Sequence, residues 1–341
     1  MKRRNVYILC TMILLMTALP LSYAQVTKVG TTAASFLEIP VGARAVGMGG
    51  AFAAVSDDAS AMYWNPSGIA RLTQSDAIFS HSAWIADISF NYGGIAIPLG
   101  EIGTLGVNFT SLTMADMERT TEESPEGTGE MFSAGSYAIG VSYARNLTDW
   151  FSIGTNIKFI NEYIWNDNAS AIAIDIGTLF TTPFSGVKFG VGIVNVGPDL
   201  HMQGSDLLVQ KDITPINGNN PNINANLVTD EFALPLTVRI GVAYEPIVTE
   251  NQHLTIALDA LHPNDNSESI NIGAEYTGIQ NILAIRGGYT AIGQKNSEES
   301  FSIGGGLRYR VENEVLVKFD YAFQNFGRLQ NVHKFSVGIG F

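Results

Sequence analysis

The stretch His333-Lys334-Phe335-Ser336-Val337-Gly338-Ile339-Gly340-Phe341 alternates between two kinds of side chain. Phe335, Val337, Ile339 and Phe341 are large and apolar, whereas the residues between them are small. A period of two is typical of a β-strand with two different faces. We interpret this stretch as the closing strand of a membrane β-barrel, because its apolar face would meet lipid and its backbone would pair with the first strand.

The same alternation recurs along most of the chain after residue 73. It predicts about fourteen strands that form an all-β, antiparallel transmembrane barrel over residues 74–341. The face opposite the apolar one carries small or polar residues, among them Arg239, Asp259, Glu275, Lys318 and Asp320. A soluble β-sandwich or propeller would alternate in the same way. Only 15% of the residues are charged, below the roughly 25% of soluble domains, which favours the membrane barrel.

The first residues predict export from the cytoplasm. A basic start, Met1-Lys2-Arg3-Arg4, precedes an apolar run over about residues 6–19 and the small-x-small site Ser22-Tyr23-Ala24. This is typical of a secretory signal peptide, residues 1–24, cleaved after Ala24. The alternative, a membrane anchor, is disfavoured because the run is short. We expect a protein of the bacterial outer membrane, in contact with lipid and lipopolysaccharide.

Charge and the sparse reactive residues exclude several functions. The formal net charge is −13, which disfavours a nucleic-acid partner because such binding needs basic patches. The single cysteine, Cys10, lies inside the predicted signal peptide. The five histidines show no ligand spacing, and no motif orders a nucleophile. We therefore predict no enzymatic activity, no catalytic residue, no cofactor and no metal site.

Connection lengths predict the orientation of the barrel. Tight turns near residues 98–101, 146–149, 183–186, 278–281 and 311–313 alternate with longer loops, the longest near 115–132 and 197–233. Tight turns are expected in the periplasm and long loops outside the cell. The first long loop is acidic and is either a solvated loop or a divalent-cation site. The second is rich in Asn and Pro, which indicates turns and not helix.

Residues 25–73 do not alternate and are predicted to form a compact hatch, or plug, inside the lumen. A barrel of about fourteen strands is too wide for its own side chains to fill. Arg44, Asp57 and Asp58 are expected to pair with lumen charges such as Arg239, Arg286, Lys318 or Asp320. Such pairs would either seat the hatch or latch it.

The hatch segment resembles a known family. Residues 42–52, followed by 57–61 and 63–68, look like the opening block of PorV/PorQ-family outer-membrane proteins, which are similar to the FadL-type transporters. The block contains Gly47, Gly49, Gly50, Phe52, Asp57, Asp58, Asn65 and Pro66. FadL-type proteins carry an Asn-Pro-Ala turn in the hatch, whereas Ser67 occupies the third position here.

The resemblance implies two functions. The first is a role in type IX-like protein secretion, with binding of secreted cargo proteins or secretion-complex subunits. The alternative is passive transport of hydrophobic small molecules, for which Met48, Phe52, Met62 and Trp64 are the expected apolar contacts. A purely structural membrane protein is a third possibility. The secretion role is preferred because the block looks more like PorV/PorQ proteins than like the transporters.

Overall fold

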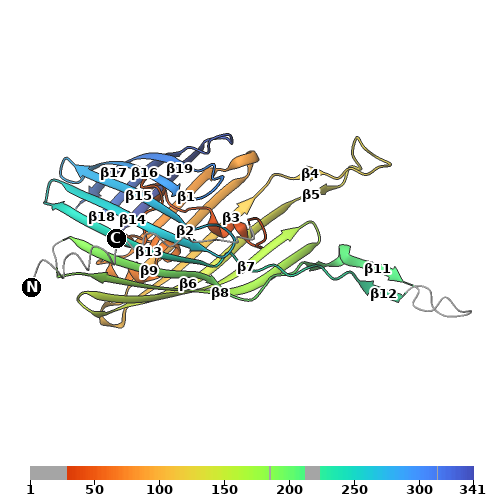
Figure 1. The fold of residues 1–341 in the computed structure, drawn as a ribbon, viewed down its shortest axis with the longest axis horizontal. Helices are drawn as coiled ribbons and strands as arrows, with labels where there is room; N and C mark the ends of the chain where they lie inside the picture. Colours follow the sequence, from red (N-terminus) through yellow and green to blue (C-terminus); the bar gives the residue numbers. More distant parts are fainter. Residues whose placement is uncertain (1–28, 184–185, 212–222, 313) are drawn as a thin grey trace, which may run out of the picture.

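The computed structural model describes residues 29–183, 186–211, 223–312 and 314–341, so the predicted signal peptide and part of the loop 197–233 lie outside the described residues. Within these ranges, 14 antiparallel strands form a closed barrel (Figure 1). Its strands are β1 (Asp76–Ala83), β2 (Ser89–Pro98), β3 (Thr104–Thr113), β6 (Ala134–Thr148), β7 (Phe151–Ile164), β8 (Asp167–Thr181), β9 (Val187–Val196), β13 (Thr237–Val248), β14 (His253–Pro263), β15 (Ser269–Gly278), β16 (Leu283–Ile292), β17 (Phe301–Val311), β18 (Val315–Gln324) and β19 (Val332–Gly340).

The first and last strands close the ring. β19 pairs with β1 along its length, with Val337 opposite Phe79. The ladder continues to the chain end, where the Phe341 N–H donates to the Ser75 carbonyl at 2.9 Å. Closure leaves no unpaired strand edge between β1 and β19. Unpaired backbone N–H and C=O groups at such an edge would be costly in lipid. The predicted barrel of about fourteen strands is confirmed, and the sandwich and propeller alternatives are excluded.

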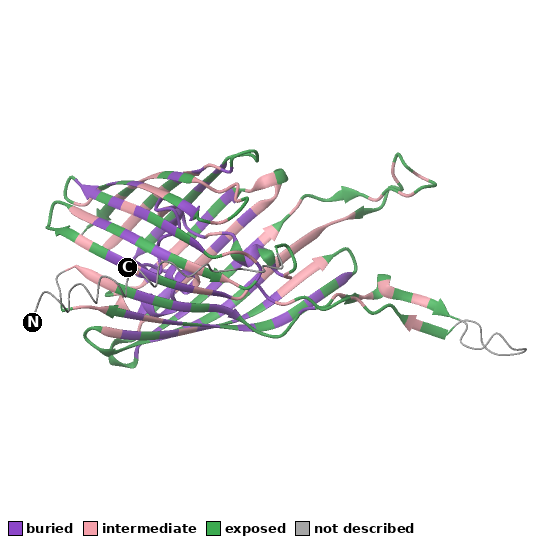
Figure 2. Cartoon of the chain, viewed as in Figure 1, coloured by how far each residue is buried: buried purple, intermediate pink, exposed green. Residues whose placement is uncertain are grey.

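The two faces of the wall differ as the alternation predicts. On β19, Phe335, Val337 and Ile339 are 56%, 40% and 42% exposed, whereas Lys334 and Ser336 are buried at 1% and 3%. Figure 2 shows this alternation as stripes along the strands. The large apolar side chains thus point outward, where lipid replaces water as their surroundings.

The long connections lie at the end of the barrel away from the C-terminus. Two of them extend as hairpins, β4 (Met117–Glu118) with β5 (Met131–Phe132), and β11 (Leu208–Lys211) with β12 (Ile223–Asn226) (Figure 1). The sequence indicated only loops here, because two- to four-residue strands give too little alternation to detect. Shorter elements in the connections are η3 (Ile85–Asp87), η4 (Gly100–Ile102), β10 (Gln203–Gly204) and η5 (Ser205–Leu207).

Four short helical turns between residues 35 and 71 are enclosed by the strands. They are η1 (Ser35–Glu38), α2 (Ala43–Gly47), α3 (Ala61–Trp64) and η2 (Pro66–Arg71). α2 contacts β16, β17, β18 and β19, whereas η2 contacts β2, β3, β6, β7 and β8, so the segment touches both halves of the wall. Among the described residues, no helix combines the length and hydropathy needed to cross a membrane.

Candidate functional site

The glycine-rich segment of residues 47–50 lets the backbone of the enclosed segment approach the barrel wall. Gly49 has φ +64°, and a Cβ there would lie 2.7 Å from the Tyr289 nitrogen and 2.8 Å from the Ile272 oxygen. The close approach is used for hydrogen bonds. The Gly49 N–H donates to the Ser302 hydroxyl at 3.0 Å, and the Thr290 hydroxyl donates to the Gly49 carbonyl at 3.1 Å. Larger residues would prevent both contacts.

The wall has its own glycines where the segment touches it. A Cβ at any of these positions would overlap backbone or side-chain atoms of residues 48–66. The wall positions are Gly154, Gly177, Gly190, Gly273 and Gly288. They come from β7, β8, β9, β15 and β16, which lie within one contiguous half of the ring. Glycine in a strand interior often marks such a close backbone approach.

Two buried polar side chains hold the backbone of residues 52–67. The Asp259 carboxylate, 1% exposed, accepts hydrogen bonds from the Phe52 and Ala53 N–H groups, both at 2.8 Å. The Asn65 amide donates to the Ala53 carbonyl at 2.8 Å and to the Thr178 carbonyl of β8 at 3.0 Å. Its oxygen accepts from the Ser67 hydroxyl at 2.6 Å. Asn65 thereby caps η2, and Pro66 occupies the first position of that turn, where its missing N–H costs nothing.

An ionic cluster joins the enclosed segment to strands β15 to β18 of the wall. Arg44 pairs with Asp57, with Asp58 at 3.2 Å and with Glu275 of β15 at 2.8 Å. Glu275 also pairs with Arg286 at 2.6 Å and with Arg308 at 3.5 Å.

The rest of the cluster continues along the wall. Arg286 pairs with Asp320 at 2.7 Å, and Lys318 pairs with Asp76 at 2.5 Å. The expectation that Arg44 itself pairs with lumen charges is met by Glu275, which was not among the partners named. Of the partners named, Arg286 and Asp320 pair with each other, and Arg239 lies elsewhere, against aromatic rings.

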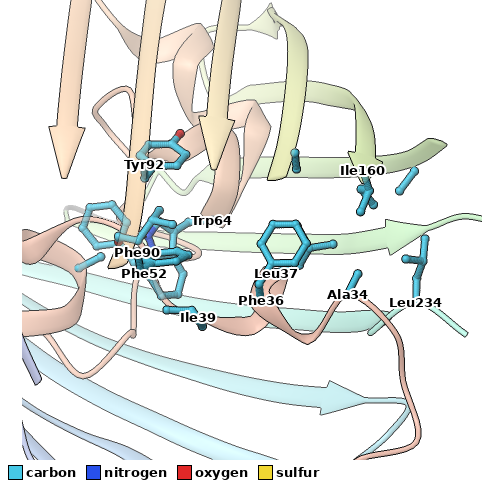
Figure 3. Close-up of a cluster of buried hydrophobic side chains, with 14 of the residues drawn as sticks. Ala34, Phe36, Leu37, Ile39, Phe52, Trp64, Phe90, Tyr92, Ile160 and Leu234 are labelled. Carbon is cyan, nitrogen blue, oxygen red and sulfur yellow. The ribbon is translucent and has the colours of Figure 1, made fainter. Parts of the chain in front are cut away.

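The expected apolar contacts separate into two packed groups. Met48, Phe52 and Trp64 belong to one buried cluster, in which the Phe52 and Trp64 rings lie 6.1 Å apart (Figure 3). Met62 packs instead with Ile69 and neighbouring alanines. All four are buried, and of the four only Trp64 lines one of the cavities described below. The role of these residues as ligand contacts stays a prediction.

The cavities next to the enclosed segment are polar. One, of about 180 Å³, lies within the ionic cluster and is lined by Arg44, Asp57, Asp58 and Lys318, among others. Two more, of about 100 and 330 Å³, share Glu38, Arg239, Leu261, Ser269, Gln294 and Glu299 as lining residues. We call these two adjoining cavities the polar chamber. It lies at the long-loop end, between the loops after β14 and after β16. A fourth cavity, of about 480 Å³, lies between the turn after β15, which contains Gln280, and the tight-turn ends of β17 and β18, where Arg310 and Leu316 lie.

Glu38 faces this chamber and is sensitive to its enclosure. Desolvation within the barrel, together with the nearby charge of Asp265, raises the pKa of the Glu38 carboxyl to about 7, although Arg239 acts in the opposite sense and Glu299 adds to the rise. As pH rises, the unfolded chain therefore loses this proton first, near the ordinary carboxyl pKa of 4.5, whereas the folded chain keeps it until about pH 7. Folding stability must fall over that interval and level off once pH passes about 7.

We therefore expect Glu38→Gln to remove part of the stability loss between pH 5 and pH 8. The amide cannot ionise, so at the higher pH the folded state carries no negative charge at residue 38 beside Asp265 and Glu299. Urea midpoints of the folded barrel at the two pH values measure the effect. Glu130→Gln, at an exposed hairpin position, is the control and should keep the slope of the parent chain. Equal slopes for Glu38→Gln and the parent would contradict the prediction.

The acidic loop shows no metal-binding arrangement. Arg119 pairs with Glu130 at 2.9 Å and lies 5.0 Å from the Trp165 ring centroid. The Glu118 carboxylate accepts from the Gly129 N–H at 2.8 Å. In the part of the chain that the structure describes, no group of three or more His, Cys, Asp or Glu residues is placed to hold a metal ion. These contacts instead tie the two sides of the β4–β5 hairpin together.

Several important residues were visible in the sequence only as members of a pattern. Asp259 and Glu275 appear there as polar residues on the inward face of strands, which identifies their direction but not their partners. The wall glycines gave no signal, because any strand glycine satisfies the alternation. The partners depend on which turn of the enclosed segment faces which strand.

Comparisons with known proteins agree with this architecture. The family described as "Type IX secretion system protein PorV" matches residues 22–262. No curated protein sequence matches the chain. Among solved structures, the chain is similar to the CymD monoaromatic hydrocarbon channel, with TM-score 0.54 and 13% identity over 89% of this chain and 97% of that one.

Two further structures have the same fold. A FadL homologue of Pseudomonas aeruginosa gives TM-score 0.53 and 11% identity over 89% of this chain and 98% of its own. The toluene transporter TbuX of Ralstonia pickettii gives TM-score 0.53 and 11% identity over 88% of this chain and 97% of its own. At these identities the likeness establishes the fold alone.

Proposed function

Because the chain belongs to the PorV family of type IX secretion proteins, we propose that it binds a secreted protein or a subunit of the secretion complex. It is an outer-membrane β-barrel associated with protein secretion. The family match carries this proposal. The role is one of binding, so we infer that the chain needs no catalytic residue, cofactor or metal.

We propose that residues 25–73 act as one unit, the hatch, and that this unit fills the lumen of the barrel formed by residues 74–341. The ionic cluster, the Asp259 hydrogen bonds and the wall glycines all support a hatch that is seated tightly. A latch that opens would need to break pairs around Glu275, which is 4% exposed, and separating buried charges is costly. We therefore favour seating over latching.

The β4–β5 hairpin is the surface that we propose for a protein partner. Within the described residues, β4 and β5 pair only with each other, so each strand has a free edge. Met117 and Met131 are both 53% exposed on it, and methionine adapts readily to varied partners. A free edge can accept a strand from another protein, which supplies main-chain hydrogen bonds. A secreted protein that presents an extended segment fits this surface.

The experiment is affinity purification of the tagged chain after crosslinking in its own outer membrane. We expect secreted proteins or secretion-complex subunits to co-purify. Replacing residues 116–131 with a short Asn-Gly turn should abolish their recovery, whereas Glu130→Gln, which keeps both strands, should not. Recovery of lipopolysaccharide and detergent alone from the parent chain would overturn the secretion role.

Passive transport of hydrophobic small molecules is the second candidate. It is favoured by the fold likeness to a monoaromatic hydrocarbon channel and a toluene transporter. Against it, the cavities beside the hatch are lined by charged and amide side chains, which an apolar molecule would desolvate without replacing their hydrogen bonds. Uptake of radiolabelled toluene by cells with and without the chain tests it. Equal uptake would exclude this function.

A further inference from the structure

The polar chamber contains buried polar atoms that lack a partner. Arg239 is 6% exposed and Gln324 is 2% exposed. In the described part of the chain, the Arg239 Nε and the Gln324 Oε1 make no hydrogen bond. Both residues line the smaller cavity of the chamber. Buried groups of this kind are normally satisfied by protein, water or a ligand.

Arg239 is held in place while its Nε stays free. Its guanidinium lies 4.9 Å from the Tyr63 ring centroid and 5.0 Å from the Trp64 ring centroid. Its Nη1 donates to the Tyr63 carbonyl at 3.3 Å. These contacts fix the side chain by cation–π attraction and one hydrogen bond. The unused donor is therefore part of a rigid wall of the chamber.

The chamber offers unused acceptors as well as this donor. The carboxylates of Glu38 and Glu299 line both cavities, and neither makes an ion pair within the described residues. Gln324 adds an amide oxygen. A third carboxylate, that of Glu298, lines the larger cavity but is paired with Arg328. The remaining polar lining groups are uncharged: Asn195, Tyr63, Thr237, Asn266, Ser269, Asn271, Thr290, Gln294, Asn296, Ser297.

This mixture selects the chemistry of a ligand. An anion would satisfy Arg239 but would meet Glu38 and Glu299. A cation would satisfy the carboxylates but would face Arg239. An apolar molecule would leave every one of these groups unpaired, which is costly. A hydroxyl both donates and accepts, so a molecule with several hydroxyls can satisfy all of them.

We propose that the polar chamber binds a small polyhydroxylated ligand of the size of a monosaccharide. The larger cavity, of about 330 Å³, lies at the lower end of ligand-site volumes, about 300–1,000 Å³, which suits a ligand with a single sugar ring. The chamber lies at the long-loop end, so such a ligand would enter from the side of the hairpins. The inference depends on the chamber and is independent of the secretion role.

The test uses the full chain in lauryldimethylamine oxide, because maltoside and glucoside detergents carry the proposed ligand chemistry. Isothermal titration with D-glucose, D-galactose and N-acetylglucosamine should give saturable binding of at least one sugar. Ethylammonium chloride and toluene serve as the cationic and apolar probes and should not bind saturably. The proposal would be overturned if ethylammonium or toluene bound saturably while no sugar did. It would also be overturned if no probe bound at all.

Gln324→Met tests the assignment to this chamber. It removes an unpaired buried acceptor at similar volume, so the ligand-free barrel should unfold at the same or a higher temperature. Sugar affinity should fall about tenfold, the effect of one lost hydrogen bond. Ser269→Ala is the second variant should Gln324→Met fold poorly, and it should also weaken binding. Gln210→Met, exposed on β11, is the control and should bind as the parent does. Unchanged affinity in both chamber variants would overturn the assignment.

Discussion

Gly273→Val is expected to prevent the proposed hatch from seating and to destabilise the folded barrel. Gly273 faces inward on β15, and a Cβ there would overlap the carbonyl oxygen of Met48. That oxygen belongs to backbone, which cannot turn aside as a flexible side chain can. Overpacking a core typically costs about 1–3 kcal/mol, and we expect the upper end of that range or more.

Two measurements separate hatch release from barrel unfolding. Folded barrel is followed by heat-modifiable migration in gel electrophoresis, and the hatch by trypsin cleavage at Arg44, which is largely buried in the parent chain. We expect Gly273→Val to lower the urea midpoint and to expose Arg44. Gly287→Val is the matched control, because a Cβ at Gly287 meets no atom within 4 Å. Parent-like stability with a protected Arg44 in Gly273→Val would contradict the close approach of residue 48 to the wall.

Glu275→Gln is expected to destabilise the folded state by about 3–5 kcal/mol, the usual cost of removing one partner from a buried ion pair. Glu275 joins the enclosed segment to the wall because it pairs with Arg44 and also with Arg286 and Arg308. The amide keeps the shape of the side chain but not its charge, so the three guanidinium groups lose their shared counter-charge. Equilibrium unfolding in urea, at low and high salt, measures the loss.

The exposed pair of Arg119 and Glu130 provides the control. Both side chains are more than 40% exposed, and such pairs contribute about 0–1 kcal/mol. Glu130→Gln should therefore change stability little, and its small effect should shrink at high salt because solvent ions screen exposed charges. The Glu275→Gln effect should persist at high salt. A loss below about 1 kcal/mol for Glu275→Gln would show that the ionic cluster does not seat the hatch.

Much of the barrel could be predicted because its pattern depends on a local rule. Each strand has one face toward lipid and one toward the lumen, so side-chain type alternates along the chain, as on β19 from Phe335 to Ile339. The period of two survives whatever the partner strand is. The composition and alternation were enough to predict an all-β barrel of about fourteen strands and its closure.

The site was less predictable because its contacts join distant parts of the chain. The block of residues 42–68 indicated a compact segment, and Arg44 was expected to pair with lumen charges. Its actual partner on the wall, Glu275, is 231 residues away. The hairpins were also missed, since strands as short as β4 and β5 leave no periodic signal.

By itself, the sequence determined the strand pattern, the outward apolar face and the position of a compact segment ahead of the barrel. Those properties follow from side-chain chemistry read along a few neighbouring residues. Tertiary structure alone decided that Gly49 touches Tyr289, that Glu275 joins three arginines, and that Arg239 and Gln324 enclose a polar chamber. The physical reason is that ring closure arranges strands from distant parts of the chain around one lumen. The register of strand pairing then sets which side chains meet inside that lumen.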